Sequence, residues 1–231
     1  MNKKSGLVLP ILLGKDSVGK DHTESLVDLK HILIAGQTGS GKSNFNHVLI
    51  KTLTDRRSPA ELRLFLADPK KIELTGYDNL PHLLMPVQTA PKAILDGLDK
   101  INKERLSRLV SKDKNFPYIV VIIDTFSDIS YEDRERFELL INSLTSNSDE
   151  TKIHIVMCDS RPSRSIFTNS LKECFPTRIS FKTTSAEDSE VILGTKGAET
   201  LLGKGEILFL GPNKEIPLWF QTPTSNFRLV E

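Results

Sequence analysis

Apolar residues along this chain gather in short continuous runs, and longer stretches of mixed polar and apolar residues separate them. Short apolar runs bounded by glycine, proline, asparagine or aspartate are typical of buried β-strands. The expected strands span residues 7–13, 31–36, 62–67, 118–123, 152–158, 178–183, 207–210 and 215–220. We expect the first of them to be an edge strand or hairpin that leads into the fold.

The stretches between these runs carry apolar residues three or four positions apart, which is the spacing of an amphipathic helix. The expected helices span residues 43–53, 93–110, 132–144 and 186–193, while residues 143–150 are expected as a surface loop. Strands that alternate with helices predict an α/β fold, with a mostly parallel central sheet and helices on both faces. Residues 1–25 are expected to form a short N-terminal β segment on a core of residues 26–231.

The composition fits a globular protein and excludes an obviously basic DNA-binding module. Hydrophobic residues are 38% and charged residues 26% of the 231 residues, so a sizeable core can form. The net charge is +1 and the pI is about 7.8, whereas compact DNA-binding domains often exceed a pI of about 9. DNA binding would therefore need a local basic stripe, an oligomer or a further domain.

Two further features concern location. Cys158 and Cys174 lie in apolar surroundings without a CxxC pair, which predicts buried free thiols and a reducing cytoplasm. No apolar run approaches the roughly 18 residues that a membrane span needs, so we expect no membrane segment in this chain. We also expect no signal peptide, since the early apolar run lacks a small-residue cleavage pattern.

Residues 36–43 read GQTGSGKS, which matches the phosphate-binding pattern G-x-x-x-x-G-K-[ST] between a predicted strand and a predicted helix. Backbone N–H groups of such a loop wrap the phosphates, and the following helix directs its positive end toward them. Lys42 would bind the β and γ phosphates, and Ser43 would bind Mg²⁺. The expected ATP contacts are Gly36, Gln37, Thr38, Gly39, Ser40, Gly41, Lys42 and Ser43.

A magnesium-binding carboxylate is expected at the end of another buried strand, and Asp124 follows the run YIVVII there. Many ATPases carry a glutamate directly after this aspartate, where it polarises the attacking water. This chain has Thr125, which cannot act as a general base at neutral pH. Asp128, four residues after Asp124, is interpreted as a capping or solvated residue.

Several segments together resemble the FtsK/SpoIIIE family of double-stranded-DNA translocases. They are KHILIAGQTGSGKS, LADPKKIELTGYDNLPHLL, YIVVIIDTFSDI, SRPS and PTRISFKTTSAEDSEVILGTKGAETLLGKGEILFLGPN. The resemblance covers nearly the whole chain and implies a RecA-like P-loop NTPase. It also implies double-stranded DNA as partner, a homo-oligomeric, hexameric ring, and a role in chromosome segregation or DNA transfer.

The resemblance implies further site residues. Arg161 falls in the loop after the strand that follows Asp124, at a position that resembles a γ-phosphate sensor. Arg105 falls on a long helix where the family carries an arginine, which implies a contact to ATP across a subunit interface. The family's glutamine before this Arg-Pro-Ser stretch is Ser160 here.

Thr125 and Ser160 remove polar groups that position or activate water, so the sequence leaves hydrolysis open while it favours nucleotide binding. One interpretation is an ATP-driven motor domain with Lys42, Asp124, Arg161 and Arg105 in catalytic roles. The alternative is a non-hydrolysing ATP-binding module in a DNA pump or in an assembly like type VII secretion.

Overall fold

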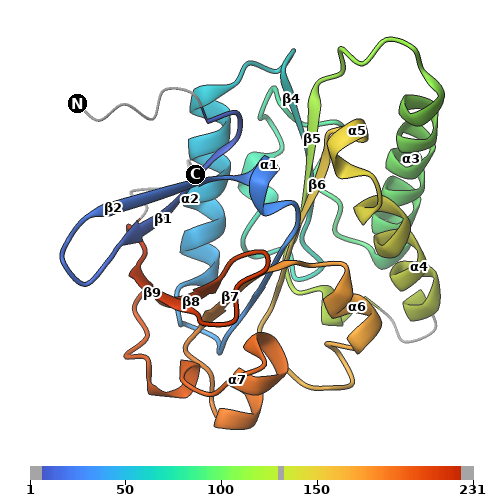
Figure 1. Ribbon diagram of the computed structural model, residues 1–231. Helices are drawn as coiled ribbons and strands as arrows, with labels where there is room; N and C mark the ends of the chain where they lie inside the picture. Colours follow the sequence, from blue (N-terminus) through green and yellow to red (C-terminus); the bar gives the residue numbers. More distant parts are fainter. Residues whose placement is uncertain (1–6, 130–132, 225–231) are drawn as a thin grey trace.

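The computed structural model describes residues 7–129 and 133–224, and in this part of the chain a nine-stranded sheet lies between helices (Figure 1). The strands are β1 (Pro10–Lys15), β2 (Asp21–Ser25), β3 (Ile32–Ala35), β4 (Leu62–Ala67), β5 (Tyr118–Ile123), β6 (Ile153–Asp159), β7 (Thr177–Phe181), β8 (Glu206–Leu210) and β9 (Leu218–Gln221). The helices are α1 (Leu26–Leu29), α2 (Lys42–Arg56), α3 (Pro91–Val110), α4 (Arg134–Thr145), α5 (Ser148–Thr151), α6 (Asn169–Glu173) and α7 (Ala186–Leu193), with short 3-10 turns η1 (Thr75–Tyr77), η2 (Phe126–Asp128) and η4 (Ala198–Thr200).

The sheet has the strand order β2-β1-β9-β8-β7-β3-β6-β5-β4. The strands from β7 to β4 in this order are parallel, and β8, β9, β1 and β2 extend the sheet with antiparallel pairs. This arrangement confirms the α/β prediction. Because parallel strands end at one edge, the loops after β3, β4, β5 and β6 gather there, which is where such folds bind ligands.

The N-terminal hairpin of β1 and β2 falls within the segment expected at residues 1–25. It joins the same sheet as the core, since Lys15 of β1 pairs with Gln221 of β9. The backbone of Leu9 also accepts a hydrogen bond from the N–H of Leu26 (2.8 Å). The division at residue 25 stays a prediction.

Two hydrophobic cores lie on opposite faces of the sheet, and alternate residues of each strand enter them. In β3, Leu33 and Ala35 pack with α3 and α4, while Ile32 and Ile34 pack with α2. Figure 1 shows α2 on one side of the sheet and α3 and α4 on the other. Burial on both faces explains why the parallel strands are apolar at nearly every position.

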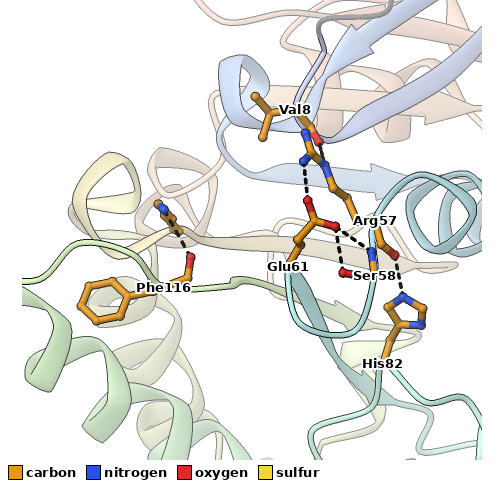
Figure 2. A network of polar contacts seen from close by, with 7 residues as sticks. Val8, Arg57, Ser58, Glu61, His82 and Phe116 are labelled. Carbon is orange, nitrogen blue, oxygen red and sulfur yellow. Dashed lines mark hydrogen bonds and ion pairs between the residues drawn. The ribbon is translucent and has the colours of Figure 1, made fainter.

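A polar network ties the N-terminal segment to the end of α2 and to the start of β4 (Figure 2). Nε–H of Arg57 donates to the carbonyl oxygen of Val8 (2.8 Å), and Nη1–H donates to Glu61 Oε1 (3.0 Å). The N–H and hydroxyl of Ser58 donate to Glu61 Oε2, and His82 Nε2–H donates to the carbonyl of Arg57 (2.8 Å). The bonds to the Glu61 carboxylate, led by that of the Ser58 N–H, lower the pKa of Glu61 to about 2.

Some boundaries differ from those expected. The surface loop expected at residues 143–150 is wrong in part, since α4 continues to Thr145 and α5 occupies Ser148–Thr151. Thr151 is buried and its carbonyl accepts a hydrogen bond from Arg108 of α3 (2.7 Å), so tertiary contacts override a polar local sequence. The helix expected from residue 132 begins at Arg134 in the described part of the chain, and residue 132 lies outside the described residues.

Gly97 explains how α3 approaches the sheet closely. A Cβ atom at this position would lie 2.4 Å from Cε2 and 2.7 Å from Cζ of the buried Phe65 ring. We predict that Gly97→Ala destabilises the fold by up to about 2 kcal/mol, because overpacking costs about 1–3 kcal/mol and the gain in helix propensity offsets only about 1 kcal/mol of it. Urea unfolding would measure the change, and the added variant Phe65→Leu is expected to restore part of the loss. Greater stability in Gly97→Ala alone would contradict the packing argument.

Candidate nucleotide-binding site

The phosphate-binding loop connects β3 to α2, and two of its glycines, Gly36 and Gly41, lie close against neighbouring residues. Gly36 has φ 149°, and a Cβ there would lie 2.6 Å from Cβ of Phe181 in β7. Gly41 caps α2 with φ 120°, and a Cβ there would lie 3.0 Å from Cα of Gly205. These two glycines are therefore required by packing inside the protein as well as by space for phosphate.

Hydrogen bonds from outside the motif fix the shape of this loop. The N–H of Gln37 donates to the carbonyl of Lys182 (2.7 Å), and the N–H of Gly205 donates to the carbonyl of Ser40 (3.0 Å). The residue after β7 and the residue before β8 thus hold the loop from both sides. No local pattern near the loop indicates this bracing, since the partners lie far along the chain.

Lys42 lies at the first position of α2 and is almost fully buried. Its ammonium donates to the carbonyl oxygens of Gly36 (2.7 Å) and Gln37 (3.0 Å). Burial lowers the pKa of Lys42, and nearby Cys158 and Asp124 act against that shift. The cation therefore lies over the loop, where phosphate oxygens can replace the carbonyl oxygens as its partners.

Asp124 follows β5 and is only 6% exposed. Its N–H donates to the carbonyl of Ala67 in β4 (2.9 Å), but its carboxylate accepts no hydrogen bond from another described residue. Burial, followed by the charges of Asp68 and Glu73, raises the pKa of Asp124 to about 6. A buried carboxylate that no described residue pairs with fits a ligand of Mg²⁺, and Ser43 lines the same cavity.

A cavity of about 430 Å³ unites the loops at this edge of the sheet. It is lined by Thr38, Gly39, Gly41, Lys42, Ser43, Asn44, Lys70, Ile72, Glu73, Asp124, Thr125 and Ser160. The structure thus brings Lys42, Ser43 and Asp124 together as predicted. Sequence reasoning missed Lys70 and Glu73 as lining residues, although a charged segment directly after the apolar strand β4 was a signal that could have indicated them.

Thr125 faces the cavity in a strained backbone conformation. Its φ is 55°, in the left-handed region, where a β-branched residue is an outlier. Buried Asp159 braces the loop that follows, because its Oδ2 accepts the N–H of Ser127 (2.7 Å) and its Oδ1 accepts the N–H of Arg161 (2.8 Å). Asp128 lies 3.9 Å from Lys70 as an ion pair and does not line the cavity.

The two predicted arginines do not line this cavity. The side chain of Arg161 is exposed on the loop after β6, next to the lining residue Ser160. Arg105 is buried between α3 and α4, where Nε–H donates to Asn102 Oδ1 (3.0 Å) and Nη2–H donates to Ser143 Oγ (2.8 Å). A role for either arginine in contact with ATP stays a prediction.

The described residues contain no helix that is both long and apolar enough to cross a membrane. Both cysteines are free, with Cys158 buried and Cys174 partly exposed, so the expectation of two buried thiols was right only for Cys158. Burial raises the pKa of the Cys158 thiol, which therefore stays protonated beside the site.

Comparisons with known sequences identify related proteins. A model of the FtsK/SpoIIIE family matches residues 2–111. The chain is 38% identical over 96% of its length to a DNA translocase FtsK of Borreliella burgdorferi, and 40% identical over 91% to one of Campylobacter jejuni. It spans 32% of the length of the first relative and 24% of the second.

Solved structures share the fold at lower identity. The pCW3 conjugation coupling protein TcpA, solved in a monomer form with ATPγS, gives a TM-score of 0.80 at 22% identity, over 96% of this chain and 68% of that chain. ATPases 2 and 3 of EccC from Thermomonospora curvata, solved in complex with a signal sequence peptide, give a TM-score of 0.81 at 16% identity. The match covers 97% of this chain and 42% of that chain. These likenesses confirm the P-loop ATPase fold.

Proposed function

The chain belongs to the FtsK/SpoIIIE family, and from this premise we propose that it is the ATP-binding motor domain of a double-stranded-DNA translocase. The observation that supports ATP binding most strongly is the single cavity that joins Lys42, Ser43 and Asp124. A cation for the phosphates, a hydroxyl and a buried carboxylate for Mg²⁺ are the groups that P-loop enzymes use for phosphoryl transfer.

The proposal includes partners and location. The relatives named DNA translocase support double-stranded DNA as the partner, and the family supports a homo-oligomer, which we expect to be a hexameric ring in the cytoplasm. With a net charge of only +1, one copy would bind DNA weakly, and several copies around one duplex would add their contacts. DNA movement would then serve chromosome segregation or DNA transfer.

A second candidate function rests on Thr125 and Ser160. Both residues line the cavity, and neither supplies a carboxylate or an amide to hold the attacking water. In this alternative the chain binds ATP without hydrolysis and stabilises a DNA pump, or an assembly like that of the type VII secretion ATPase EccC, whose cytoplasmic domain shares the fold.

Phosphate release from Mg·ATP separates the two candidates. The rate would be measured with and without long duplex DNA, at low and moderate salt, beside Lys42→Ala. If DNA stimulates phosphate release and Lys42→Ala abolishes it, the result supports the motor domain. If the chain binds ATP tightly but releases phosphate no faster than Lys42→Ala, the result supports the non-hydrolysing module.

We predict that Thr125→Glu raises the rate of hydrolysis about tenfold, because it places a carboxylate directly after Asp124 in the cavity wall. The backbone also favours the change, since glutamate lacks the β-branch that strains Thr125 at φ 55°. Thr125→Gln is the matched control and is expected to leave the rate unchanged. Equal rates in Thr125→Glu and the unmodified chain would mean that a glutamate at this position does not limit the reaction.

A further inference from the structure

Glu73 occupies a fixed place in the wall of the cavity, although no part of the phosphate-binding or magnesium motif includes it. It belongs to the loop after β4, and the buried carboxylate of Asp68 holds this loop in shape. Oδ2 of Asp68 accepts the N–H of Glu73 (2.8 Å) and the N–H of Leu74 (2.9 Å). The Glu73 side chain is 32% exposed, so it faces both the protein and the open cavity.

A histidine of α2 lies against this carboxylate. His47 follows Ser43 by four residues, so both lie on one face of α2, one turn apart. Nε2 of His47 lies 3.7 Å from Oε2 of Glu73, and Nδ1 lies 2.9 Å from the hydroxyl of Tyr77. When the Tyr77 hydroxyl donates to Nδ1, the proton of the neutral imidazole is on Nε2 and points toward Glu73.

Two further observations place the charge of Glu73 beside the reacting groups. It lines the same cavity as Lys42, Ser43 and Asp124. Its charge is also among the causes that raise the pKa of Asp124, after burial and Asp68. The cavity wall therefore holds a carboxylate that can accept a proton from water, which the hydroxyl of Thr125 cannot do.

We propose that Glu73 orients and deprotonates the water that attacks ATP, with His47 as the residue that positions its carboxylate. This proposal rests on the proposed ATPase function. It explains how the chain could hydrolyse ATP without a glutamate after Asp124, because a neighbouring loop supplies the carboxylate.

In this step the water oxygen forms a bond to the γ phosphorus, and the bond from that phosphorus to the β–γ bridging oxygen breaks. The electron pair of the broken bond stays on that oxygen, which leaves as part of ADP. One oxygen of Glu73 accepts the proton of the water and later releases it to solvent, so ATP and water yield ADP, phosphate and a proton.

The test compares Glu73→Gln with the same substitution at Glu61, a carboxylate that precedes β4 as Glu73 follows it. Glutamine keeps a hydrogen-bond acceptor for His47 and removes the base. Glu61, before β4, also binds a turn and a basic side chain but lies outside the cavity, so Glu61→Gln is the control. DNA-stimulated kcat, KM, the calorimetric Kd for ATPγS and the unfolding midpoint would be measured for each variant.

We expect Glu73→Gln to lower kcat about 100-fold or more while the Kd for ATPγS changes less than about threefold. His47→Gln is expected to lower kcat about tenfold with KM unchanged, a pattern that a merely structural contact would not give. If the unmodified chain hydrolyses ATP and Glu73→Gln hydrolyses it at the same rate, the role of Glu73 is overturned and the ATPase function still stands. A loss of ATPγS affinity that matches the loss of kcat would overturn it as well. Absence of hydrolysis in the unmodified chain would overturn both.

Discussion

Lys42→Ala is expected to remove most of the affinity of the chain for Mg·ATP. The ammonium lies within hydrogen-bond distance of the loop carbonyls of Gly36 and Gln37, so it reaches the phosphates without a large movement. Loss of a hydrogen bond to a charged group costs about 1.5–3 kcal/mol, or about 10- to 150-fold in Kd. Folding should survive, because the variant also removes a buried cation whose bonds to the described residues are to carbonyl oxygens and not to a carboxylate.

Calorimetry and thermal unfolding with ATPγS would measure this effect. Ligand at about 100 times its Kd stabilises a protein by about 2.7 kcal/mol, and a hundredfold weaker variant would gain only about 0.4 kcal/mol. Lys51→Ala is the matched control, since Lys51 lies on the same helix and pairs with Asp55 at the surface (2.8 Å). Equal affinity in Lys42→Ala and the unmodified chain would show that this lysine does not bind the phosphates.

The parts of the fold that could be predicted from sequence are those that local pattern determines. The strands β4 and β5 and the helix α7 match the expected residues 62–67, 118–123 and 186–193. Each is a continuous or periodic apolar segment with clear polar ends. The phosphate-binding loop was also predictable, because one short motif carries the glycines, Lys42 and Ser43.

The parts of the fold and of the site that sequence did not predict depend on tertiary contacts, above all on which strands become neighbours in the sheet. Glu73 follows β4 and Asp124 follows β5, so their meeting requires the parallel pairing of these two strands. The bracing of the loop by Lys182 and Gly205 depends in the same way on β7 and β8. Helix α5 was missed because its polar sequence gains its burial from contacts with Arg108 rather than from a hydrophobic pattern.

Two buried histidines are expected to make the fold labile in weak acid. The Nε2–H of His31 donates to the carbonyl of Thr145 (3.1 Å), and its Nδ1 accepts the N–H of Ile155 (3.1 Å). The Nδ1–H of His154 donates to the carbonyl of Lys30 (2.8 Å). His31 uses both ring nitrogens as a neutral imidazole does, so protonation would break its bond from Ile155.

Burial is the main cause that lowers the pKa of His31 to about 3 and that of His154 to about 4. Unfolded histidine has a pKa near 6.5, so between about pH 6.5 and pH 4 the unfolded chain binds more protons. The contribution of the two neutral rings to the free energy of unfolding is therefore fully present above about pH 6.5 and is lost as the pH falls. At pH 5 the loss is about 2 kcal/mol for each ring. Asp124 acts in the opposite direction, because burial raises its pKa to about 6 and its protonation then favours the folded state.

Urea unfolding from about pH 8 to pH 5 would isolate the histidine contribution. His154→Asn keeps an N–H donor for the carbonyl of Lys30 and removes the titrating ring, so its free energy of unfolding should fall less steeply below pH 6.5. The expected difference in slope is about 1.4 kcal/mol per pH unit. Ile155→Val, in the same strand, is the control and should lower the whole curve by about 0.5–1.5 kcal/mol without a change of slope. A curve for His154→Asn that runs parallel to the unmodified chain would mean that this ring accepts its proton as readily in the folded state as in the unfolded one.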